Sequence, residues 1–138
     1  MKEKILSSLS KRLKSEVSKR NPVRFLSEQG NLADALDAAI EVLYVYTRSK
    51  RGNSKSILLT EVVCAMGHAI RELYKLSKDS ALAAKSGAFM LYSFQDQGLL
   101  EVKLGAGTGK HQTYIIEVLK DDAIVALWEA LAPEKITS

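Results

Sequence analysis

Hydrophobic residues recur at helical spacing over most of this chain of 138 residues. Near the amino terminus, apolar side chains at every fourth position predict an amphipathic helix over residues 2–19. These side chains are Ile5, Leu9, Leu13 and Val17. Asn21-Pro22 ends the pattern, because proline disfavours helical backbone in the residue before it.

The same spacing predicts two helices in the next part of the chain. The first has Asn31 as its N-cap and ends near Arg48. Residues 49–56 are polar and include the pair Gly52-Asn53, so they predict a loop. The second helix spans about residues 58–76. Its expected buried face holds Val62, Met66, Ala69, Ile70 and Leu73.

A fourth helix is expected to begin after a cap at Ser77 or Asp79 and to run to about Gln97. Gly98 then ends it, since glycine adopts the left-handed backbone that closes many helices. The side chains that share one face of this helix are Leu82, Ser86, Phe89, Met90 and Ser93.

The period changes from helical to alternating just after Gly98. Residues 100–104 and 114–118 show this alternation, which predicts two strands. The connection contains three glycines, so the strands form a β-hairpin with a long, flexible tip. A last helix is capped by Asp121 or Asp122 and ended by Pro133. The fold class is therefore mainly α with a small β-hairpin, an α+β arrangement.

The segment from Leu82 to Val102 resembles the winged helix-turn-helix family. Its run FMLYSFQDQGLLE, residues 89–101, is similar to the end of many recognition helices: an apolar face, a polar turn, glycine, two aliphatic residues and then the wing. The resemblance covers about residues 32–131. It implies a winged-helix domain over residues 28–138, preceded by a basic N-terminal helix and linker over residues 1–27.

This resemblance implies contacts with double-stranded DNA. A recognition helix lies in the major groove with its first residues at the base edges. Lysine there donates to guanine or phosphate, serine donates or accepts, and alanine suits a thymine methyl. The residues at these positions are Lys78, Ser80, Ala81, Ala84 and Lys85. No Arg, Asn or Gln lies among them, so few side chains read bases directly, and the alternative is that both lysines are merely solvated.

The glycine-rich tip and the loop before residue 58 are candidate phosphate contacts. Three glycines let the backbone approach a phosphate closely, while Thr108, Lys110 and His111 supply donors. The loop would add a second contact through Arg48, Lys50, Arg51 and Lys55. The alternative interpretation is a flexible hairpin loop in one case and a solvated basic segment in the other.

The distribution of charge favours a polyanionic partner more than the net charge of +4 does. Residues 1–27 carry eight basic and two acidic groups, and residues 48–57 carry four basic groups and no acid. Separated basic blocks neutralise phosphates and release counterions. Residues 91–138, in contrast, carry seven acidic and four basic groups, which favours a protein-interaction adaptor of the same fold.

The helix over residues 2–19 allows several roles: a phosphate-contacting arm, a dimerisation helix or a helix on a membrane surface. Residues 1–24 contain no Trp or Phe, which disfavours the membrane. We favour packing against a partner chain or against the core of the domain.

The sequence gives little support for an enzyme. Leu104 occupies the place of the first glycine in a Walker motif, and the tip is flanked by two strands, so we reject a P-loop. Cys64 and His68 have the spacing of metal ligands, but no second pair accompanies them, so we expect no metal or cofactor and a buried Cys64. A single cysteine and no long apolar run favour a cytoplasmic protein.

A weaker likeness concerns residues 60–132. The segments 65–70, 87–100 and 114–132 are similar to the promoter-binding amino-terminal region of phage-type single-subunit RNA polymerases. That likeness implies a detached promoter-recognition or accessory piece.

We therefore expect a non-enzymatic homodimer that binds DNA in transcription regulation, or in plasmid or phage replication and partition. The alternatives are a winged-helix adaptor or accessory subunit of a transcription complex and, less favoured, an RNA-associated basic domain.

Overall fold

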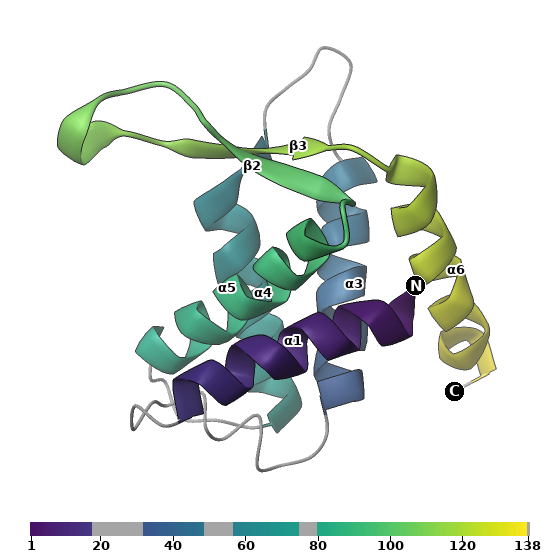
Figure 1. Cartoon of the computed structure of the whole chain (residues 1–138). Coiled ribbons are helices and arrows are strands. Elements are labelled where there is room, and N and C mark those ends of the chain that lie inside the picture. Colours follow the sequence, from purple (N-terminus) through teal and green to yellow (C-terminus); the bar gives the residue numbers. More distant parts are fainter. Residues whose placement is uncertain (18–31, 49–56, 75–79, 138) are drawn as a thin grey trace.

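The computed structural model describes residues 1–17, 32–48, 57–74 and 80–137 (Figure 1). Within these ranges the chain forms five α-helices and one small sheet. The helices are α1 (Lys2–Val17), α3 (Leu32–Arg48), α4 (Leu59–Tyr74), α5 (Ser80–Asp96) and α6 (Asp121–Thr137). The strands are β1 (Ile57–Leu58), β2 (Leu100–Leu104) and β3 (Tyr114–Val118), and a single 3₁₀ turn, η1 (Gly109–His111), lies between β2 and β3. The predicted α+β class, mainly helical with a small hairpin, is confirmed.

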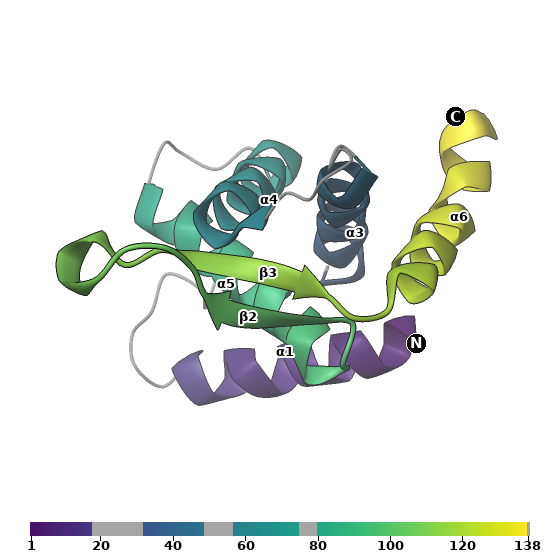
Figure 2. The same cartoon turned by 90° about the horizontal axis from the view of Figure 1, so that it is seen from above.

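The three strands form one antiparallel sheet in the order β1-β3-β2. In Figure 1 the sheet lies above the helices, and Figure 2 looks down onto its uncovered face. β1 was not predicted, since residue 58 was assigned to a helix. A two-residue strand is too short to show alternation, and it exists because Ile57 pairs with Ile116 and Leu58 with Ile115.

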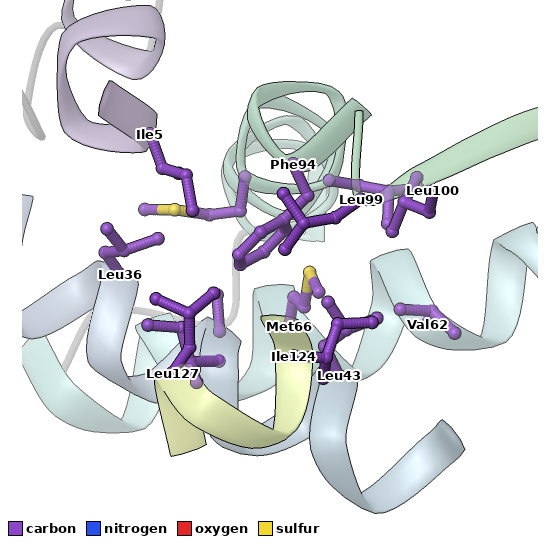
Figure 3. Close-up of a cluster of buried hydrophobic side chains, with 14 of the residues drawn as sticks. Ile5, Leu36, Leu43, Val62, Met66, Phe94, Leu99, Leu100, Ile124 and Leu127 are labelled. Atoms are coloured by element: carbon purple, nitrogen blue, oxygen red, sulfur yellow. The ribbon is translucent and has the colours of Figure 1, made fainter. Parts of the chain in front are cut away.

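The core gathers side chains from every helix and from the sheet around Phe94, which is fully buried (Figure 3). Ile5, Leu9 and Leu13 of α1 are at most 1% exposed, so the predicted apolar stripe is confirmed at these three positions, and the side chain of Val17 lies outside the described part of the structure. α1 packs on α5 and α3 and belongs to the same core. Burying a side chain of this size stabilises a fold by about 1.5–3 kcal/mol.

Two predictions on the third helix of the sequence, α4, are wrong. Val62, Met66 and Ile70 are buried at a spacing of four residues, but Leu73 is 44% exposed. Cys64, expected to be buried, is exposed. It follows Val62 by two residues, which is about 200° around a helix, so it lies on the side away from the core.

α5 ends as predicted, with Gly98 in the left-handed region at φ 77°. The amide of Leu99 donates to the carbonyl of Phe94, and the amide of Gly98 donates to the carbonyl of Gln95. This pair of bonds is the Schellman arrangement, and it buries Leu99 beside Phe94. The side chain of Gln95 also accepts a bond from the amide of Val102, which joins α5 to β2.

Side-chain contacts fix the outer helices to the rest. The guanidinium of Arg12 donates to both carboxylate oxygens of Asp96 at 2.8 and 2.6 Å, and this pairing raises the pKa of Arg12. On the other flank the rings of Tyr44 and Trp128 stack with centroids 4.1 Å apart, which holds α6 against α3.

Pro133 does not end α6, contrary to the prediction, because the helix continues to Thr137. Proline lacks the N–H that would bond the carbonyl of Glu129, four residues earlier, and its ring crowds that carbonyl, but the rest of the helix is retained. Glu129 is exposed, so water can replace the lost donor.

Candidate nucleic-acid interface

α4 and α5 cross with their backbones in close contact. A Cβ atom at Gly87 would lie 2.2 Å from the carbonyl oxygen of Val63 and 3.0 Å from the amide nitrogen of Gly67. Any larger residue at position 87 would therefore push the two helices apart. Gly87 thus fixes the direction in which the first turns of α5 project.

The first turns of α5 and the hairpin tip lie toward the same side of the molecule, at the left of both Figure 1 and Figure 2. Lys85, in the second turn of α5, is exposed. Ser80 and Ala84 belong to this end of α5, but their side chains lie outside the described part of the structure. Lys78 lies outside the described residues altogether.

The hairpin of β2 and β3 extends beyond the body of the molecule and ends in an ordered tip, residues 105–113. The amides of Gly105, His111, Gln112 and Thr113 all donate within the tip. The side chain of Gln112 adds bonds to the carbonyls of Gly105 and Thr113 at 3.0 and 2.8 Å. The tip predicted to be flexible is therefore cross-linked by its own hydrogen bonds.

The tip carries exposed hydrogen-bond donors. The amides of residues 107–110 take no part in the bonds just described, and Thr108, Lys110 and His111 are exposed. Gly107 has a φ of 95°, and a Cβ atom there would lie 2.0 Å from the carbonyl oxygen of His111. Glycine is thus required for this compact turn, which carries Thr108, Lys110 and His111, the three residues predicted to bind phosphate.

Charge changes sign along the hairpin. Its base carries Glu101 and Glu117, and Lys103 pairs with Glu117 at 2.9 Å, which raises the pKa of Lys103. Residues 102–116 contain no acidic side chain. The projecting part of the hairpin is consequently positive, and Lys110 is the cation nearest its end.

Arg48 is the one residue of the predicted basic loop that the structure describes, and it does not lie at this tip. Arg48, the last residue of α3, is ion-paired with Asp121 at the start of α6, and its guanidinium lies 5.2 Å from the ring centroid of Tyr44. Asp121 follows β3, so this pair lies at the end of the hairpin opposite the tip. Lys50, Arg51 and Lys55 fall outside the described residues.

Two exposed residues of the hairpin escaped the sequence analysis. Leu104 is 67% exposed and Tyr114 is 44% exposed, although alternation placed both on the apolar face of their strands. Alternation shows which face of a strand is apolar, but it does not show how far along the strand the helices cover that face. Gln112, the side chain that closes the tip, gave no signal in the sequence.

Other kinds of site find no support in the described part of the chain. Nowhere within it do three or more His, Cys, Asp or Glu side chains gather as metal ligands. None of the helices described above is both long and apolar enough to cross a membrane. His68 is exposed and its Nδ1 lies 2.9 Å from Nη2 of Arg71, so it is not paired with Cys64.

Comparison of the chain with protein-family models, with curated proteins and with solved structures finds no match.

Proposed function

We propose that this chain is a winged helix-turn-helix protein that binds double-stranded DNA. The observation that carries the proposal is the order α3-β1-α4-α5-β2-β3 together with the strand order β1-β3-β2. A winged helix has this order of elements, with the helix before the hairpin as its recognition helix and the hairpin as its wing. The close crossing of α4 and α5 at Gly87 supports the helix-turn-helix assignment.

In this proposal α5 enters the major groove and the wing tip contacts the phosphate backbone. Lys78, Ser80, Ala84 and Lys85 are the candidates for contacts with base edges. The tip contributes the exposed side chains of Thr108, Lys110 and His111. Contacts of this second kind position a protein on the duplex without reading its sequence.

We infer a role in transcription regulation or in plasmid or phage replication and partition, exercised as a cytoplasmic homodimer. Two-fold symmetric proteins of this class read half-sites about one helical turn apart. α6 is a candidate dimerisation helix, since its exposed side includes Ala126 and Ala130.

Selection from random duplexes, followed by binding measurements at several salt concentrations, tests the proposal. We expect an enriched sequence, and a logarithm of the binding constant that falls linearly with the logarithm of salt concentration. Binding without any such slope would contradict the phosphate contacts, and absence of binding at low salt would contradict the function.

A protein-interaction adaptor is the second candidate, including an accessory subunit of a transcription complex. It is favoured by the internal pairing of four of the described cations. The pairs are Lys2 with Asp37, Arg12 with Asp96, Arg48 with Asp121 and Lys103 with Glu117. Cations in such pairs are less available to phosphates. Capture of a defined protein, with no duplex retained at low salt, would select this alternative.

A further inference from the structure

Two large apolar side chains lie next to each other on the projecting part of the hairpin, and we call them the wing patch: Leu104 and Tyr114. They are direct cross-strand partners, so their side chains lie on the same face of the hairpin. Their exposed fractions are 67% and 44%. The wing patch is therefore uncovered apolar surface beside the positive tip.

The same face of the hairpin is buried nearer the body. Leu100 and Ile116 are 1% and 4% exposed, and they lie on the face that carries the wing patch because side chains alternate along a strand. The apolar face thus continues past the point where helices cover it. Nothing in the folding of the described core requires leucine and tyrosine at these two positions.

Charge indicates what covers the patch. No acidic side chain occurs between residues 102 and 116, and the tip beyond the patch carries the exposed side chains of Thr108, Lys110 and His111. A molecule that covers the wing patch must therefore carry apolar groups directly beside a negative charge. The backbone of DNA does so, because each phosphate is flanked by deoxyribose rings whose carbon atoms are apolar.

We infer that Leu104 and Tyr114 pack against deoxyribose rings of the strand whose phosphate the wing tip holds. This inference rests on the proposed function and names an additional contact within it. The contact releases no counterions, so it adds affinity that does not depend on salt, unlike the contacts of Lys110.

The test is the affinity of Leu104→Ser and of Tyr114→Ser for a duplex, measured over a series of salt concentrations. We expect each substitution to weaken binding by about tenfold at every salt concentration, with the salt slope unchanged. Tyr114→Phe should bind like the wild type, because the ring is kept. Leu119→Ser is the matched control, since Leu119 is 49% exposed at the other end of the hairpin.

The outcomes separate this inference from the function on which it rests. A wild-type chain that binds no duplex would overturn both. A wild-type chain that binds, with serine variants of equal affinity and unchanged thermal unfolding, would overturn the wing patch alone. So would serine variants that change the oligomeric state by analytical ultracentrifugation, because a second copy of the chain would then be the occupant.

Discussion

At the scale of single residues, Lys110 is the side chain on which the phosphate contact depends most. It lies on η1 at the end of the hairpin, in a stretch without acidic residues. Its ammonium group is therefore available to an anion, whereas Lys103 is engaged by Glu117. The two lysines differ in their availability to an anion because the acidic residues of the hairpin lie only at its base.

Lys110→Ala should weaken binding to all duplex sequences alike and lower the magnitude of the salt slope by about 1. The reason is the loss of one phosphate contact with its released counterion. Fluorescence anisotropy at several salt concentrations measures both quantities. Lys120→Ala, at the other end of the hairpin, is the control, and an unchanged slope in Lys110→Ala would contradict the role of the tip.

Lys85→Ala should instead reduce the preference for particular sequences. A lysine that donates to guanine in the major groove contributes discrimination of about 1–3 kcal/mol at one base pair. Parallel selections from random duplexes with the wild type and the variant measure this preference. Identical enriched sequences would show that Lys85 is only a solvated side chain.

At the scale of elements, α1 is part of the core rather than a detachable basic arm. Leu9 is fully buried between α1 and the rest of the molecule. Ser8 and Arg12 add polar contacts to the end of α5, through Gln97 and Asp96. α1 thus holds the carboxyl end of α5, the helix that precedes the hairpin.

Leu9→Ala should lower the free energy of unfolding by about 2–5 kcal/mol, because it leaves a cavity in the core. Lys11→Ala, at an exposed position of the same helix, should change it by less than about 0.5 kcal/mol. Urea unfolding followed by circular dichroism measures both. Equal stabilities of the two variants would mean that α1 does not belong to the cooperative unit.

Gly87→Ala should destabilise the fold, although alanine normally stabilises a helix relative to glycine by up to about 1 kcal/mol. The added Cβ atom would lie 2.2 Å from the carbonyl oxygen of Val63, so α4 and α5 must separate. Overpacking of this kind costs about 1–3 kcal/mol. Thermal unfolding shows whether the substitution lowers or raises the stability, and a raised melting temperature would contradict the close helix crossing.

The elements that were predictable from the sequence are those whose signal is local. The stripe of Val62, Met66 and Ile70 repeats within one helix, and Gly98 marks a helix end through its own backbone preference. β1 was missed because it depends on pairing with β3, in which Ile116, the partner of Ile57, lies 59 residues later. The exposure of Tyr114 was missed because alternation does not say how far the core extends.

At the scale of the whole molecule, the candidate surface combines two parts that are distant in the sequence. The end of α5 around Lys85 and the tip around Lys110 lie toward one side. The sequence identified both parts separately and also included Arg48, which the fold places at the far end of the hairpin with Asp121. Only the tertiary arrangement shows that Arg48 and Lys110 lie at opposite ends of the hairpin, since both are basic residues of segments predicted as loops.

Hydrogen exchange with and without a duplex tests most directly whether α5 and the wing tip form the DNA-binding face. We predict that saturating duplex slows amide exchange in residues 80–88 and 106–112 and leaves α6 unchanged. Slowed exchange confined to α6, or no slowing at α5 and the tip in a chain that binds the duplex, would contradict the account.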